Sequence, residues 1–181
     1  GGLGTHVCVP LQGSGTFIVE AMLGTLVPPS GRLAILVNGA YGKRMVRICE
    51  YLRRACVVLE TAQDTPVSAA TLDASLEADP AITHVVVVQC ETTSGVLNPV
   101  EEIAAVTARH HRRLLVDAMS AFGALPLDAA RVSYEALVAS SNKCLEGVPG
   151  VGFAIIRQSA LEEARGNAHA LSFDLHDQWV A

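Results

Sequence analysis

Short runs of β-branched and aliphatic residues alternate along the chain with longer stretches whose apolar positions recur every three or four residues. The expected strands cover residues 33–37, 55–59, 83–89, 114–116 and 136–139, and residues 151–156 form a further strand suited to antiparallel pairing. Helices are expected over residues 16–26, 43–54, 69–78 and 100–111, with a short one over 128–132. Strands that alternate with helices indicate right-handed crossovers in a mostly parallel sheet flanked by helices. We therefore expect an α/β fold in one domain or most of one.

The run of four valines at residues 85–88 is apolar on both faces, which is typical of a central parallel strand covered by helices on each side. In such sheets, ligands bind in the loops that follow the carboxyl ends of the strands. The chemically unusual residues gather in the loops expected there, at residues 13–16, 38–42, 91–95, 117–120 and 140–143. These loops are the places to look for a site.

Composition narrows the class of protein. Half of the 181 residues are hydrophobic and 17% are charged, which excludes intrinsic disorder. The formal net charge of −5 leaves no basic surplus for nucleic acid. No apolar run approaches the roughly 18 residues of a membrane span, and no secretory signal opens the chain, so we expect a soluble, cytoplasmic protein. Five widely spaced cysteines without C-x-x-C, and six histidines without ligand spacing (His176 among them), predict reduced thiols and no metal.

The two ends of the chain differ from ordinary domain ends. The sequence starts at Gly1 without a methionine and soon becomes apolar, and it stops at Ala181 directly after a patterned segment. Domain termini are usually polar and frayed. We expect a piece of a longer protein.

A glycine-rich loop is the first candidate for chemistry. Gly13-Ser14-Gly15-Thr16 precedes a helical pattern, where free backbone N–H groups and two hydroxyls suit a phosphate. The dinucleotide fingerprint fails because Ile18 stands in place of its last glycine, and no Walker A loop occurs. The alternative is a plain Ser/Thr helix N-cap behind a tight turn.

Two charged residues each follow a predicted core strand. Asp117 comes after the run 114–116, and a buried carboxylate there needs a cation or several donors, unless it only caps a turn. Lys143 follows the run 136–139, where a desolvated lysine would be nucleophilic; the alternative is a surface lysine. A lysine for a Schiff base, an acid for a pyridinium nitrogen and a phosphate cradle are together what pyridoxal 5′-phosphate requires.

Six segments occur in order that carry a family resemblance: PLQGSGT at 10–16, VNGAYGKR at 37–44, CETTSGVLNP at 90–99, VDAMS at 116–120, SNKCLEGVPG at 141–150 and DLHDQW at 174–179. The chain resembles the class V aminotransferases, pyridoxal-phosphate enzymes of fold type I, and within them the members that act on 2-aminoethylphosphonate and pyruvate. The N-G-x-aromatic-G-x-R and Asp…Lys elements are general to the class, whereas the fifth and sixth segments are more specific. The resemblance covers residues 1–181, as a cofactor-binding large domain truncated at both ends.

The resemblance implies roles for the candidate residues. Lys143 would form the Schiff base with the cofactor and later act as the general base. Asp117 would pair with the protonated pyridine nitrogen. Ser14, Gly15 and Thr16 would hold the phosphate.

Three further residues receive roles from the same resemblance. Tyr41 would stack on the cofactor ring, Thr92 would bond its 3′-oxygen, and Asn142 would sit beside the Schiff base. From the bare sequence, Tyr41 is equally an ordinary loop aromatic and Thr92 a turn hydroxyl.

The implied reaction moves the amino group of 2-aminoethylphosphonate to pyruvate, giving phosphonoacetaldehyde and L-alanine in a step of phosphonate degradation. The resemblance also implies a homodimer and a small-molecule substrate, with substrate-binding arginine outside this chain. His176 stands where tyrosine is expected. We expect residues 1–181 alone to be weakly active or inactive. The alternatives are another class V aminotransferase (alanine–glyoxylate or serine–pyruvate type), an inactive remnant, or a nucleotide-binding domain.

Overall fold

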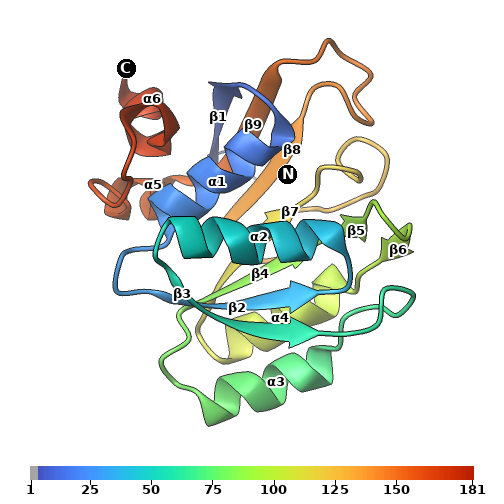
Figure 1. The fold of residues 1–181 in the computed structure, drawn as a ribbon. Helices are drawn as coiled ribbons and strands as arrows, with labels where there is room; N and C mark the ends of the chain where they lie inside the picture. Colours follow the sequence, from blue (N-terminus) through green and yellow to red (C-terminus); the bar gives the residue numbers. More distant parts are fainter. Residues whose placement is uncertain (1–3) are drawn as a thin grey trace.

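A seven-stranded sheet runs through the middle of the computed structural model, which describes residues 4–181 (Figure 1). Its order is β1-β9-β8-β7-β4-β2-β3. The strands are β1 (His6–Gln12), β2 (Arg32–Val37), β3 (Ala55–Glu60), β4 (His84–Val88), β7 (Arg113–Asp117), β8 (Ala136–Ser140) and β9 (Val151–Arg157). Strands β3, β2, β4, β7 and β8 are parallel, and β9 pairs antiparallel with both β8 and β1. The predicted α/β fold and the antiparallel strand at 151–156 are confirmed.

Helices cover both faces of the sheet. One face packs against α1 (Gly15–Leu26), α2 (Ala40–Tyr51), α5 (Gln158–Glu163) and α6 (Leu175–Val180), and the other against α3 (Ala69–Ala78) and α4 (Val100–Arg109). Side chains of the valine run alternate between the two cores, since Val86 and Val88 face the first layer while Val85 and Val87 face the second. Every residue of β4 is buried, as the run predicted. Because helices cover both faces of the sheet, a site has to lie at the ends of the strands.

Several elements depart from the sequence predictions. Helix α2 begins at Ala40 rather than at residue 43, because residues distant in sequence supply its N-terminal contacts. Residues 128–132 form a turn, not a helix: Asp128 caps the N–H of Ala130 at 2.9 Å and so satisfies the backbone locally. Strand β1, the short hairpin of β5 (Cys90–Glu91) and β6 (Val96–Leu97), the 3₁₀ turn η1 (Leu171–Phe173) and helices α5 and α6 were not predicted.

Strand β1 lies at an edge of the sheet and contains Pro10. Proline lacks a backbone N–H, so a strand that contains it belongs at an edge where one side needs no partner. The alternation of Val7, Val9 and Leu11 toward the interior is the two-residue period of a strand, which the sequence carries although the proline obscures it. Since β1 runs in the same direction as β8, its carboxyl end reaches the same edge as those of β7 and β8.

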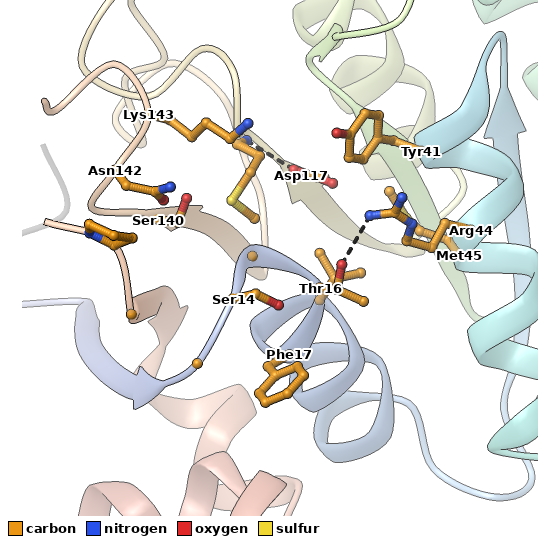
Figure 2. Close-up of a pocket in the computed structure, with 16 residues that line it drawn as sticks. Ser14, Thr16, Phe17, Tyr41, Arg44, Met45, Asp117, Ser140, Asn142 and Lys143 are labelled. Atoms are coloured by element: carbon orange, nitrogen blue, oxygen red, sulfur yellow. Dashed lines mark hydrogen bonds between the residues drawn. The ribbon is translucent and has the colours of Figure 1, made fainter. Parts of the chain in front are cut away.

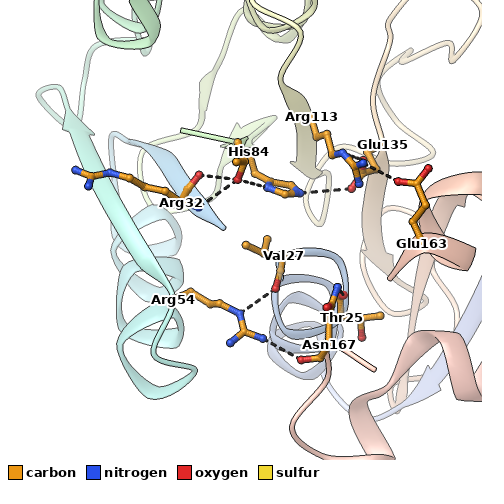
Figure 3. A network of polar contacts seen from close by, with 10 residues as sticks. Thr25, Val27, Arg32, Arg54, His84, Arg113, Glu135, Glu163 and Asn167 are labelled. Carbon is orange, nitrogen blue, oxygen red and sulfur yellow. Dashed lines mark hydrogen bonds and ion pairs between the residues drawn. The ribbon is translucent and has the colours of Figure 1, made fainter. Parts of the chain in front are cut away.

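Arg54 joins the ends of two helices at the opposite end of the sheet (Figure 3). Its guanidinium is buried and donates to the carbonyl oxygens of Val27 at 2.9 Å and Leu52 at 3.2 Å, just after α1 and α2, and to that of Asn167 at 3.0 Å. Carbonyl groups at helix C-termini carry partial negative charge, so they stabilise a buried cation without a carboxylate.

Within residues 4–181, none of the helices has the length and apolarity that a membrane span requires.

Candidate active site

A cavity of about 550 Å³ opens at the carboxyl ends of β1, β7 and β8 (Figure 2). Its lining comes from the loop after β1, the first turns of α1 and α2, the end of β7 and the loop between β8 and β9. Of the eight residues predicted for the site, seven line this cavity: Ser14, Gly15, Thr16, Tyr41, Asp117, Asn142 and Lys143. The eighth, Thr92, is not part of the lining. The fold thus brings four distant segments to one place.

The start of α1 forms an anion cradle. Ser14 is the N-cap residue, but its side chain makes no capping hydrogen bond, which leaves its hydroxyl facing the cavity (Figure 2). The plain N-cap alternative is therefore not what the structure shows. A Cβ at Gly15 would lie 2.8 Å from the sulfur of Met119, so a larger residue there would require the Met119 side chain to move. The N–H groups, the dipole of a 12-residue helix and the hydroxyls suit a phosphate.

Asp117 ends β7 on the far side of the cavity and is 2% exposed. One carboxyl oxygen accepts a hydrogen bond from the backbone N–H of Met119 at 2.9 Å. Burial raises the pKa of Asp117 to about 6, and the charge of Glu91 adds to the rise, while the Met119 N–H, Arg44 and Lys143 oppose it. A cation placed against the second oxygen would favour the ionised carboxylate. The predicted buried acid is thus present, with room for a positive partner.

Lys143 lies three residues beyond the end of β8, in the loop that returns to β9. Its side chain is exposed, so the idea of a lysine desolvated by the strand is wrong: β8 stops at Ser140, and the loop carries the lysine into the open part of the cavity. The loop itself is tied down, since the hydroxyl of Ser141 donates to the carbonyl of Val148 at 2.6 Å. The amine extends over the cavity towards Asp117 (Figure 2).

Tyr41 and Arg44 lie one turn apart at the start of α2. The guanidinium carbon of Arg44 is 4.8 Å from the centre of the Tyr41 ring, and its Nη1 donates to Oγ1 of Thr16 at 3.0 Å (Figure 2). Sequence reasoning gave Arg44 no role, although it is the last residue of the N-G-x-aromatic-G-x-R element. Its position one turn after the aromatic residue was the available signal.

Ser140 and Asn142 complete the lining near the lysine. The Ser140 hydroxyl is buried, and no hydrogen-bond partner for it exists among the described residues. A buried hydroxyl without a partner is a group that a ligand can satisfy. Thr92 lies outside the lining, directly after β5, where its hydroxyl hydrogen-bonds that of Ser120.

Glu91 is a buried acid that sequence reasoning did not assign. One carboxylate oxygen accepts from the hydroxyl of Thr93 at 2.7 Å and from the N–H of Tyr41 at 3.5 Å, and the Thr93 hydroxyl accepts from the N–H of Ala40. The chain's own Gly39 caps α2 without a side chain, so the hairpin supplies the cap from outside. The other carboxylate oxygen has no partner within the part of the chain described.

His176, for which the sequence shows no ligand spacing, lies beside two carboxylates. Asp174, His176 and Asp177 each place a possible ligand atom within 4.8 Å of the others. Asp174 is occupied as the N-cap of α6, where it accepts from the N–H groups of His176 at 2.9 Å and Asp177 at 3.3 Å. A helix cap accounts for the arrangement.

A family model described as aminotransferase class-V matches residues 27–172. The chain belongs to the class V aminotransferase family. This class V chain is 58% identical over 177 residues to a 2-aminoethylphosphonate–pyruvate transaminase of Pseudomonas putida and 57% identical over 178 residues to one of Pseudomonas aeruginosa. Each match covers 98% of the chain and 48% of the relative. The chain spans about half the length of the curated relatives it matches.

Solved structures agree with this class V fold. Pyridoxamine-pyruvate aminotransferase from Mesorhizobium loti superposes with a TM-score of 0.86 at 27% identity, over 95% of this chain and 45% of that one. Alanine–glyoxylate aminotransferase from Nostoc superposes with a TM-score of 0.87 at 22% identity, over 95% and 46%, which bears on the fold alone. The predicted resemblance and fold class are confirmed.

Proposed function

We propose that residues 1–181 form the cofactor-binding large domain of a pyridoxal-phosphate aminotransferase that moves the amino group of 2-aminoethylphosphonate to pyruvate. The products would be phosphonoacetaldehyde and L-alanine. The observation that carries the proposal is one cavity that collects an anion cradle at Ser14–Thr16, a buried acid at Asp117 and an amine at Lys143. The names of the relatives support the choice of substrate. We also expect a cytoplasmic homodimer of the whole protein, as the resemblance implies.

The residues present fit pyridoxal 5′-phosphate at both of its ends. The hydroxyl of Ser14, which makes no capping hydrogen bond, and the N-terminus of α1 offer donors to a phosphate. Asp117 is buried enough to need a positive partner, which a protonated pyridine nitrogen provides. The buried Ser140 hydroxyl, for which the described residues offer no partner, also belongs to the lining and is a further donor or acceptor. When bound, the cofactor supplies an electron sink for the carbanion formed on an amine substrate.

The chain's own residues would bind, orient and move protons. Ser14 and Thr16 would bind the phosphate and so fix the position of the ring in the cavity. The Asp117 carboxylate would accept a hydrogen bond from the protonated pyridine nitrogen and stabilise its positive charge. Lys143 Nζ is the nucleophile that holds the cofactor and, once released by the substrate amine, the base that takes the proton from the substrate's amine-bearing carbon. Thr92 and Asn142 are proposed to support the 3′-oxygen and the lysine.

An absorbance titration tests the proposal directly. In the whole protein, pyridoxal phosphate should give the band of a lysine adduct, and adding 2-aminoethylphosphonate should remove that band faster than alanine or serine does. A faster response to alanine or serine would overturn the phosphonate substrate and favour another class V reaction. A stable adduct in the whole protein that no amine removes would overturn transamination while keeping the cofactor site. A thermal shift with NAD or ATP and none with pyridoxal phosphate would indicate a nucleotide domain instead.

A further inference from the structure

We propose that Arg44 is the side-chain cation that binds the cofactor's phosphate, acting beside the hydroxyl of Thr16. This assignment rests on the proposed function, because it concerns the same cavity. It adds a charged ligand to a cradle that otherwise consists of neutral donors.

The geometry places Arg44 at the phosphate end of the cavity. Arg44 starts from α2, Thr16 from α1, and the Nη1–Oγ1 hydrogen bond of 3.0 Å brings the guanidinium to the mouth of the cradle (Figure 2). Its other contact is the face of Tyr41, at 4.8 Å. Among the described residues, no carboxylate forms an ion pair with Arg44. The remaining N–H donors of its planar fork are therefore available to a ligand.

The negative charge of the phosphate is the reason that a cation is needed. A phosphate monoester carries about −1.5 to −2 at neutral pH, whereas a helix N-terminus offers the equivalent of about +0.5. The hydroxyls of Ser14 and Thr16 add no charge. Of the residues that line the cavity, Arg44 and Lys143 are the ones with cationic side chains, and Lys143 lies on the side of Asp117. Arg44 is left for the phosphate, and a guanidinium binds phosphate oxygens in pairs.

Arg47 provides a matched control on the same helix. It lies one turn beyond Arg44, is exposed, and does not line the cavity. If α2 merely needed positive charge, the two arginines would be equivalent. If the phosphate needs a ligand, only Arg44 matters.

The experiment compares two ligands that differ by the phosphate. Wild type, Arg44→Met, Arg44→Lys and Arg47→Met are each titrated with pyridoxal phosphate and with pyridoxal, following adduct absorbance. Arg44→Met should weaken pyridoxal phosphate binding about 10- to 100-fold, the range for a charge-assisted hydrogen bond, and leave pyridoxal binding within about twofold. Arg44→Lys should recover part of the loss, and Arg47→Met should match wild type. Added inorganic phosphate should compete in wild type and much less in Arg44→Met.

Equal losses for both ligands would overturn the assignment and make Arg44 a packing partner of Tyr41. Unchanged pyridoxal phosphate binding would also overturn it, as would an effect seen only on the response to 2-aminoethylphosphonate, which would move Arg44 to the substrate's phosphonate. If wild type forms no adduct with either ligand, the proposed function fails and the assignment fails with it. Arg44 is exposed, so both of its variants should fold, and circular dichroism with thermal unfolding checks this.

Discussion

The side-chain amides of Asn38 and Asn98 exchange two hydrogen bonds: Nδ2 of Asn38 donates to Oδ1 of Asn98 at 2.9 Å, and Nδ2 of Asn98 donates back at 3.1 Å. Both side chains are buried. Asn98 also accepts from the N–H of Val67 at 3.0 Å and donates to the carbonyl of Val88 at 2.8 Å. The pair therefore connects the end of β4 to the loop that leads into α2 and Tyr41.

Loss of this pair should destabilise the fold. Asn98→Ala keeps the bond from Nδ2 of Asn38 to the carbonyl of Thr65, but it removes the partner of Asn38 Oδ1 and the side-chain bonds to the Val67 N–H and the Val88 carbonyl. The free energy of unfolding should therefore fall by about 2 kcal/mol in chemical denaturation. The matched control is Asn142→Ala, an exposed asparagine, which should change stability by less than about 0.5 kcal/mol. Equal stability of the two variants would show that the amide pair is not what holds the loop.

The titration of Asp117 should appear in the pH dependence of stability. Its pKa is about 6 in the fold against an ordinary 3.8, so the folded chain binds more protons than the unfolded chain in this window. Stability from this group is present below pH 4 and is lost as the pH rises through 6. The stability of wild type relative to Asp117→Asn should therefore fall by about 2 kcal/mol between pH 4 and pH 6. A constant difference between the two proteins from pH 4 to 7 would contradict the burial of a carboxyl group there.

His84 and Glu135 form a buried pair whose two members should change the stability of the fold in opposite directions as the pH rises. Nε2 of His84 faces Oε1 of Glu135 at 3.8 Å, and Arg113 reaches the other oxygen of Glu135 at 3.3 Å (Figure 3). Burial raises the pKa of Glu135 to about 7 and lowers the pKa of His84 to about 4. The contribution of Glu135 to the stability of the fold is therefore lost as the pH rises to 7. The contribution of His84 increases as the pH rises from 4 to about 6.5.

Two variants separate these slopes. Relative to wild type, Glu135→Gln should become more stable as the pH rises from 4.5 to 7, and His84→Gln should become less stable as the pH rises from 4 to 6.5. Chemical denaturation at several pH values measures both. Parallel curves for wild type and both variants would show that neither group titrates differently on folding.

Sequence patterns predicted those elements whose stabilising contacts are local. Helix 69–78 was placed with the observed bounds because its period is regular and Ser68 caps it by accepting from the N–H of Thr71 at 3.1 Å. Strand β4 was predicted because four consecutive β-branched residues favour a strand that is buried on both faces. The turn at 128–132 was missed because turn chemistry at Asp128 outweighed a weak helical pattern.

The missing parts of the site depend on contacts between distant residues. Arg44 reaches Thr16 across 28 residues, and Glu91 reaches Tyr41 across 50, which no local period records. The exposure of Lys143 follows from where β8 ends, and that end depends on pairing with β7 and β9. The positions of Asp117 and the glycine loop were predictable because each directly adjoins an element with a clear pattern.

Trapping of the cofactor on a lysine tests the central claim most directly. The chain has two lysines, and Lys43 is a built-in control because it is exposed and paired with Glu60 at 2.9 Å. After incubation with pyridoxal phosphate, borohydride reduction and peptide mapping, the account predicts the label on Lys143, and its loss in Lys143→Ala but not in Lys43→Ala. A label on Lys43 or the α-amino group alone, with the protein folded, would contradict it.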